Sequence, residues 1–232
     1  MRDSGGSALN RRYIIGAIVA AVVVVGVLVL LSVSGSDDKS VSSIQGVEEV
    51  QAQLKGVPSS GNTIGEPTAP VEIIEYGDTS CPICKDASET SIPQVIDQFV
   101  RPGDVKMSFR PIAFISPSSE RGALGAEAAG MQDAMWEFVE VIYRNQGPET
   151  DDWLTDDLLE EAVTKMGLDV EKWKTDYAGE PVASQFFERQ TQADADKVTG
   201  TPFFVVNGPG GTDSFSGAVG VARFREAIEK VS

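Results

Sequence analysis

The apolar and polar residues of this chain follow patterns that change along its length. The first pattern is an uncharged apolar run over residues 13–33, which at about 1.5 Å per residue can cross a hydrocarbon layer of about 30 Å. Two arginines precede this run and two aspartates follow it, a charge bias that places the amino terminus in the cytoplasm. We therefore predict a cytoplasmic tail over residues 1–12 and a single-pass transmembrane anchor over 13–33, with the following domain outside the cytoplasm. A cleaved signal peptide is the alternative, but its apolar core usually covers only about 7–15 residues.

A linker with a short amphipathic segment is predicted over residues 34–64. Its first part is rich in Ser and Asp, which favours a flexible connection. Apolar residues then recur at helical spacing: Ile44, Val47, Val50 and Leu54. This spacing predicts either a short helix packed on the following domain or a partly ordered stalk. Residues 58–70 are rich in Gly, Ser and Pro and are expected to form a loop.

Strands and neighbouring helices are predicted from the patterns that follow. Residues 71–76 are rich in β-branched and aromatic side chains, residues 104–112 alternate apolar with polar positions, and residues 203–206 form a short apolar run. A turn rich in Gly and Pro comes next, so residues 212–216 can return as a hairpin partner. Helical spacing over residues 92–99 and near the carboxyl terminus predicts a helix after the first strand and another at the end of the chain.

The block between the second and third strands, about residues 118–198, is too long for a loop and is predicted to be a helical subdomain. Its apolar stripe comprises Met131, Met135, Phe138, Val139 and Ile142. The three tryptophans of the chain are interpreted as packing residues. The element order therefore predicts an α/β domain over residues 65–232 that contains a helical insertion.

Composition narrows the possible functions. The formal net charge of −16 disfavours nucleic acid and anionic membrane surfaces as partners, and we expect it mainly to keep the domain soluble. The chain contains no histidine. This excludes Ser-His-Asp and Cys-His catalysis, and it also excludes every metal site that depends on imidazole.

The only two cysteines of the chain lie three residues apart in the tetrapeptide Cys81-Pro82-Ile83-Cys84. Residues i and i+3 of a helix share a face, so both sulfur atoms are predicted to project to the same side. A strand, a short turn and a dithiol on the first turn of a helix are typical of a thioredoxin-like redox motif. Two alternatives are a structural disulfide, which would remove little chain entropy across so small a loop, and a zinc site shared between molecules.

Three segments resemble the DsbA family of thiol–disulfide oxidoreductases, most closely its membrane-anchored extracytoplasmic members. They are residues 65–71, residues 75–85 around the dithiol, and residues 200–208, where Gly-Thr-Pro precedes an apolar strand. The resemblance extends from about Leu54 to the carboxyl terminus and includes a helical insertion of the right size and place. It implies a thioredoxin-like fold with that insertion.

The resemblance also implies roles for single residues. Pro202 is expected to form a cis peptide bond against the dithiol, and the backbone of Thr201 is expected to pair with an extended substrate. At the start of a helix, Cys81 would face unpaired N–H groups and the positive end of the dipole, which favour the nucleophilic thiolate. Cys84, one turn further in, is expected to be shielded and to act as the resolving thiol. Pro82 suits the first helical turn because it lacks an N–H that would be unpaired there.

Several neighbours modify these expectations. Ile83 stands where strongly oxidising members have histidine, so we expect a less depressed pKa at Cys81 and a weaker oxidant. Glu75 lies on the predicted buried strand and matches the family's buried carboxylate. A proton-relay role and a solvated strand-end position are both open. Lys106 can pair with Glu75 or lie exposed on its own strand. Asp78 is expected to be solvated.

The principal hypothesis is an enzyme that forms or exchanges disulfides in cysteine-containing exported proteins. In this family a membrane protein of the DsbB or vitamin K epoxide reductase-like type reoxidises the dithiol, and no cofactor or metal is expected. The alternatives are a non-catalytic thioredoxin-like binding or holdase module anchored at the membrane, and a disulfide isomerase or reductase. A copper-handling relative is more remote because such sites generally recruit a histidine as well.

Overall fold

The computed structural model describes residues 43–232. The predicted cytoplasmic tail, the transmembrane anchor over residues 13–33 and the first part of the linker lie outside the described residues. Within residues 43–232, no helix combines the length and the apolar character needed to cross a membrane.

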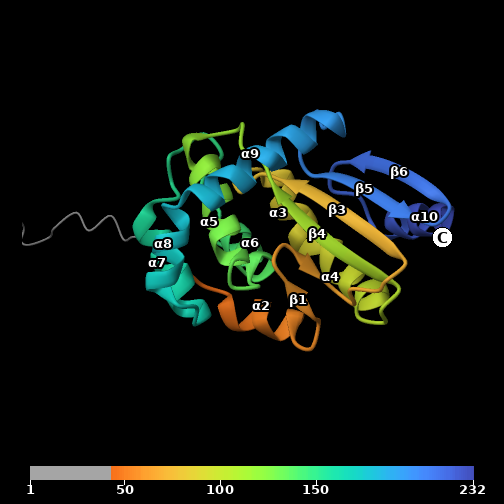
Figure 1. Ribbon diagram of the computed structural model, residues 1–232, viewed down its shortest axis with the longest axis horizontal. Helices are drawn as coiled ribbons and strands as arrows, with labels where there is room; N and C mark the ends of the chain where they lie inside the picture. Colours follow the sequence, from red (N-terminus) through yellow and green to blue (C-terminus); the bar gives the residue numbers. More distant parts are fainter. Residues whose placement is uncertain (1–42) are drawn as a thin grey trace, which may run out of the picture. The chain divides into compact units, whose positions relative to one another are not determined.

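A six-stranded mixed sheet forms the centre of the domain, in the order β1-β2-β4-β3-β5-β6 (Figure 1). The strands are β1 (Ser59–Ser60), β2 (Thr63–Ile64), β3 (Val71–Gly77), β4 (Val105–Pro111), β5 (Phe203–Gly208) and β6 (Gly211–Ser216). β3 pairs parallel with β4 and antiparallel with β5. The predicted hairpin is present as β5 and β6. The parallel pair requires a crossover through helix, and that crossover carries the dithiol.

β3 is central because both of its faces are buried. Val71 and Ile73 belong to the main core, whereas Ile74 and Tyr76 belong to a smaller cluster on the opposite face. Side chains alternate along a strand, so Glu75 points toward the main core with Ile73. β3 therefore carries one carboxylate into the apolar interior.

Four helical segments complete the sheet unit. They are α3 (Pro82–Thr90), α4 (Ile92–Val95), the π-helical turn η1 (Ile96–Val100) and the closing helix α10 (Val221–Val231). Their apolar residues join the main core of the sheet. α10 is amphipathic as predicted and buries Phe224, Ala227, Ile228 and Val231. The active-site end of α3 is thus held on a packed surface.

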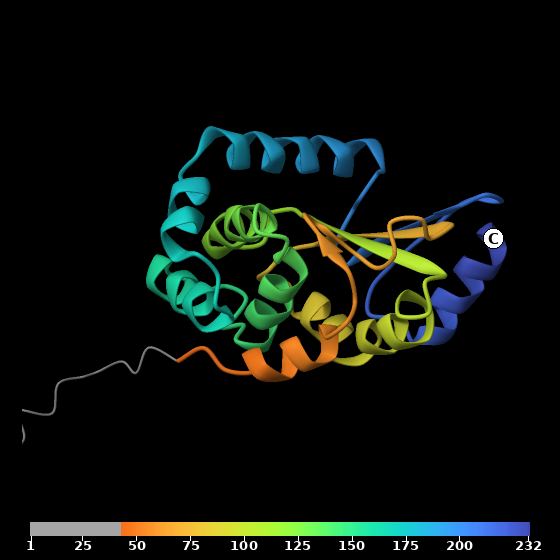
Figure 2. The same cartoon turned by 60° about the horizontal axis from the view of Figure 1, so that its bottom comes forward.

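The helical insertion lies between β4 and β5. It consists of α5 (Pro117–Gly130), α6 (Met135–Arg144), α7 (Asp156–Met166), α8 (Val170–Tyr177) and α9 (Glu180–Ala195). Polar caps start three of these helices: Ser116, Thr155 and Asp169 accept backbone hydrogen bonds with their side chains. Figure 2 shows α9 running back from the helical block toward the sheet. The predicted α/β unit with a helical insertion is confirmed.

Local details correct two expectations and decide between the two alternatives for the amphipathic segment. The stretch expected to be loop contains β1 and β2, because Ile64 is buried and pairs with Met107 of β4. Met131 ends α5 and is 42% exposed, so the buried stripe of α6 begins at Met135. The amphipathic segment is a helix, α2 (Val47–Leu54), which packs on α6 through buried apolar residues and is therefore part of the domain.

Candidate active site

The dithiol lies where the chain leaves β3 and enters α3, and both cysteines are free thiols. Cys81 is the N-cap residue, and its sulfur accepts a hydrogen bond of 3.3 Å from the backbone N–H of Cys84. Pro82 follows in the first helical turn, where no N–H is required. The Cys81 sulfur thus takes the place of the usual capping oxygen and faces the positive end of the helix dipole.

The two thiols have opposite pKa shifts. The pKa of Cys81 falls from 9.0 to about 6, chiefly through a hydrogen bond with the Cys84 side chain. The nearby Thr201 and the backbone of Cys84 and Ile83 lower the pKa of Cys81 further, while burial opposes them. Burial is the main cause that raises the pKa of Cys84, which is fully enclosed. These shifts favour a thiolate at Cys81 and a thiol at Cys84 near neutral pH. The pKa of Cys81 is thus lowered although isoleucine, and not histidine, is the residue before Cys84.

The second segment at the dithiol comes from the loop before β5. The Thr201–Pro202 peptide bond is cis, and the Thr201 carbonyl oxygen lies 3.3 Å from the Cys81 sulfur. Pro202 is buried, and its carbonyl accepts a hydrogen bond from the backbone N–H of Gly217 after β6. Two segments about 120 residues apart therefore meet at the reactive sulfur. Cys81 is only 3% exposed, whereas Ile83 beside it is 48% exposed.

Glu75 is buried behind the dithiol. It is 2% exposed, and its pKa is raised by burial first and then by the charges of Glu140 and Cys81. Of the two alternatives for Lys106, pairing with Glu75 is wrong. Lys106 lies opposite Glu72 in the β3–β4 register, on the other face of the sheet, and its ammonium donates to the Pro67 carbonyl at 3.3 Å. The period-two alternation of strand side chains separates the two groups.

Asp78 is buried rather than solvated. Its carboxylate accepts hydrogen bonds from the backbone N–H groups of Ser80 (2.9 Å), Phe114 (3.0 Å) and Ile115 (3.3 Å). These bonds join the turn before the dithiol to the segment after β4. Asp78 therefore holds the loop in which Cys81 lies, a role that no local sequence pattern indicates.

The helical insertion supplies active-site neighbours that the sequence analysis missed. The Gln146 side-chain amide, just after α6, donates to the carbonyls of Thr79 (2.8 Å) and Cys81 (3.0 Å). Glu140 and Tyr143 of α6 are almost completely buried beside the dithiol helix. A charged residue within an apolar helix is the one signal that could have identified Glu140.

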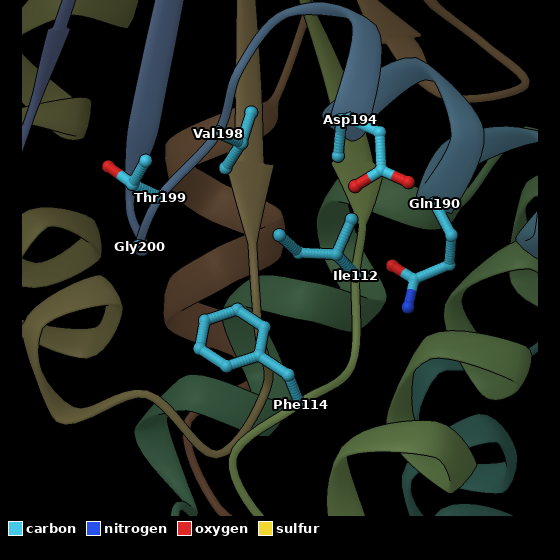
Figure 3. Close-up of a pocket in the computed structure, with 8 residues that line it drawn as sticks. Ile112, Phe114, Gln190, Asp194, Val198, Thr199 and Gly200 are labelled. Carbon is cyan, nitrogen blue, oxygen red and sulfur yellow. The ribbon is translucent and has the colours of Figure 1, made fainter.

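A pocket of about 280 Å³ opens next to the loop that carries Thr201. Figure 3 shows Ile112 and Phe114 with Val198 on its apolar side, and Gln190 of α9 at its polar side. The segment Thr199–Gly200 borders the pocket immediately before the cis bond. Phe114 is 60% exposed, an unusual position for so large an apolar side chain. Within residues 43–232, no group of three or more metal-ligating side chains is present.

Comparison with known proteins agrees with this geometry. A family model described as thioredoxin matches residues 59–230. Probable disulfide bond formation protein D of Bacillus cereus is 33% identical over 154 residues, which cover 65% of this chain and 71% of that protein. Disulfide bond formation protein D of Bacillus subtilis is 30% identical over 172 residues, which cover 70% and 74%.

Solved structures show the same relationship. Oxidised BdbD from Bacillus subtilis superimposes with a TM-score of 0.66 at 26% identity, over 75% of this chain and 97% of that one. DsbA of Chlamydia trachomatis shares the fold with a TM-score of 0.63 at 19% identity, over 73% and 90% of the two chains. Because the matches span most of the described domain, the chain belongs to the thioredoxin family and, within it, to the DsbA-type thiol–disulfide oxidoreductases.

Proposed function

We propose that Cys81 is the nucleophilic thiol of this oxidoreductase and that Cys84 is its resolving thiol. In the oxidised enzyme, a substrate thiolate attacks the Cys81 sulfur, the Cys81–Cys84 bond breaks, and Cys84 leaves with the bonding electron pair. A second substrate thiolate then attacks the substrate sulfur of the mixed disulfide. This step releases Cys81 as a thiolate and leaves a substrate disulfide. The opposite pKa shifts of the two thiols are the observation that carries this assignment.

The same shifts favour oxidation of substrates as the net direction. A thiol of low pKa is a good leaving group, and a stabilised thiolate makes the reduced enzyme the preferred state. Isomerase or reductase activity is the alternative direction for the same dithiol. A potential near about −120 mV would indicate an oxidase and one near about −270 mV a reductant.

The substrate is an extended, cysteine-containing segment of an exported protein. Its backbone pairs with Thr201, next to the cis bond at Pro202, while its sulfur meets Cys81. The adjoining pocket with Phe114 and Ile112 accepts an apolar side chain of the same segment. Such a surface suits unfolded polypeptides, which expose apolar residues before their disulfides form.

The domain works outside the cytoplasm, attached by the apolar run over residues 13–33 and the linker over residues 34–64. Disulfides persist in that compartment and not in the reducing cytosol. Each turnover leaves a reduced dithiol, so a membrane protein of the DsbB or vitamin K epoxide reductase-like type accepts its two electrons. The electrons leave through Cys81 and Cys84 and require no bound cofactor.

Equilibration with glutathione tests the assignment. The full chain in detergent is incubated in a series of reduced and oxidised glutathione, and the state of the dithiol is read by alkylation and mass. We expect a two-electron transition that both Cys81→Ser and Cys84→Ser abolish. Cys84→Ser is also expected to trap mixed disulfides with exported proteins through Cys81. Failure of the wild-type chain to equilibrate, together with full cellular function of Cys81→Ser, would instead support a holdase without turnover.

A further inference from the structure

Four buried polar side chains come from the three elements β3, α3 and α6 around the dithiol. This buried cluster consists of Glu75 on β3, Ser88 on α3, and Glu140 and Tyr143 on α6. Each is at most 2% exposed. Isolated carboxylates in an apolar interior are costly, so two of them in one cluster require a reason.

Contacts among α3, α6 and β3 show that the cluster lies near Cys84. Ser88 follows Cys84 by one helical turn on the same face of α3, and its hydroxyl donates to Glu140 Oε2 at 2.6 Å. Tyr143 lies one turn after Glu140, on the same face of α6. A Cβ added at Gly77 would lie 2.6 Å from the Tyr143 hydroxyl, and Gly77 shares a β3 face with Glu75. α6 thus places the Glu140 carboxylate against α3 at Ser88 and the Tyr143 phenol against the end of β3 at Gly77.

The charges around Glu140 do not neutralise it fully. Arg144 of its own helix and the Ser88 hydroxyl favour the ionised form, whereas Glu89 of α3 disfavours it. Burial dominates and raises the pKa of Glu140 to about 7. Other carboxylates of neighbouring helices have their own partners: Glu127 of α5 bonds Arg189, Glu161 of α7 bonds Lys165, and Glu137 of α6 accepts from Gln51 of α2.

The Tyr143 hydroxyl belongs to the same buried cluster. It is buried, makes no hydrogen bond of ordinary length with the described residues, and stays protonated because burial and the nearby Cys84 and Glu75 raise its pKa. A neutral hydroxyl can both donate and accept a proton. It therefore suits a position between carboxylates and a thiol.

We propose that Glu140 is a positioning residue for proton exchange at Cys84, because its carboxylate and that of Glu75 are two like charges enclosed in one buried cluster. The inference rests on the proposed roles of Cys81 and Cys84. Two like charges in such a site cannot both ionise readily, so the pair retains one proton near neutral pH and can either give or accept one.

The proton balance follows each half-reaction. When a substrate thiolate opens the disulfide, Cys84 leaves as a thiolate and takes the proton of the carboxylate pair. Water then returns one proton to the pair. This proton balances the one that the substrate thiol lost to water when it became a thiolate. On reoxidation through a mixed disulfide at Cys81, Cys84 gives its proton to the ionised carboxylate. The Cys84 thiolate attacks the Cys81 sulfur, and the thiolate of the oxidant leaves.

Oxidation of the reduced protein by glutathione disulfide separates the reaction of Cys84 from that of Cys81. Cys81 first forms a mixed disulfide with glutathione, and Cys84 then displaces glutathione. Both rate constants are measured by rapid acid quench over about pH 5 to 9. In Glu140→Gln we expect the first step to be unchanged. The plateau rate of the second step should fall about tenfold, and its inflection should move at least about one pH unit to the acid side because the like charge beside Glu75 is gone.

Matched variants make the result specific. Ser88→Ala removes the hydrogen bond that favours ionised Glu140, so the inflection should move to higher pH, opposite to Glu140→Gln. Glu140→Asp should restore part of the plateau rate. Glu127→Gln removes a glutamate of equal exposure on α5, away from the dithiol, and should leave both steps unchanged.

The outcomes are distinguishable. Wild-type inflections in both Glu140→Gln and Ser88→Ala, or an equal effect of Glu127→Gln, would overturn the inference and leave the roles of the cysteines intact. Absence of the first step in the wild-type protein would instead reject the proposed function. If Glu140→Gln does not fold, the alkaline shift of Ser88→Ala decides the question, since that variant keeps the carboxylate.

Discussion

At the scale of single residues, the chemistry is divided between groups that the sequence identifies and groups that only folded neighbours define. Cys81 and Cys84 were recognisable because residue type and spacing alone determine that two thiols share a helix face. Asp78 and Glu140 were not, because an aspartate or glutamate at those positions is solvated or buried according to segments far away in the chain. The two alternatives for Lys106 could not be decided for a related reason, since the choice required a strand register that sequence cannot supply.

The first prediction at this scale concerns the cause of the low pKa at Cys81. Its largest contribution is the hydrogen bond with the Cys84 side chain. Cys84→Ala should therefore raise the pKa of Cys81 from about 6 toward its ordinary value of 9.0. The measurement is the alkylation rate of the reduced protein as a function of pH. Ile83→Ala is the matched control, because Ile83 contributes only its backbone. If the midpoint of the alkylation profile is unchanged in Cys84→Ala, the low pKa of Cys81 is caused by the helix start alone.

At the scale of elements, periodicity located the central strands and the helical block, because apolar spacing reports burial directly. It missed β1 and β2, which are two residues long and too short to show a period. It also could not show how closely the helices approach the active-site loop. A Cβ at Gly122 of α5 would overlap the Thr79 side chain, two residues before Cys81. α5 reaches that loop only because a glycine lies at the contact.

Gly122→Ala tests this contact, because the contact and helix propensity predict changes of opposite sign in the free energy of unfolding. Alanine inside a helix is usually favoured over glycine by about 1 kcal/mol. Here the overlap with Thr79 should reverse the sign and lower the free energy of unfolding by about 1–3 kcal/mol. Urea denaturation of the oxidised protein measures the change. Adding Thr79→Ala should recover part of the loss, whereas a stabilised Gly122→Ala protein would show that α5 can move away without cost.

At the scale of the whole molecule, the active site belongs to both parts of the domain. The sheet unit contributes the dithiol, Glu75 and the cis-proline loop, and the helical insertion contributes Gln146 and Glu140. The sequence predicted two parts and a dithiol in one of them. It did not predict that the insertion closes over the dithiol, because that depends on packing between α3 and α6. The oxidation state of the dithiol is therefore coupled to the stability of the entire fold.

This coupling predicts that the reduced protein gains stability relative to the oxidised protein as pH rises. In the reduced protein, Cys81 has a pKa of about 6 when folded and an ordinary value of 9.0 when unfolded. The unfolded chain thus binds more protons between these values, and the free energy of unfolding rises there by about 1 kcal/mol per pH unit. In the oxidised protein Cys81 cannot titrate, and the disulfide shifts the curve only by an amount independent of pH.

The contribution of Glu140 to the free energy of unfolding changes with pH in the opposite direction, but it does not obscure the contribution of Cys81. Its folded pKa of about 7 exceeds the ordinary 4.5, so its contribution is present at low pH and is lost as pH rises toward 7 in both oxidation states. The difference between reduced and oxidised unfolding free energies therefore cancels the Glu140 contribution, and Cys81 is its main cause below pH 9: the difference should be flat below about pH 6 and grow from there to about pH 9. Urea unfolding with and without reductant measures it, and reduced Cys81→Ser should lack the rise. Parallel curves for the two oxidation states would show that the folded protein does not stabilise the thiolate.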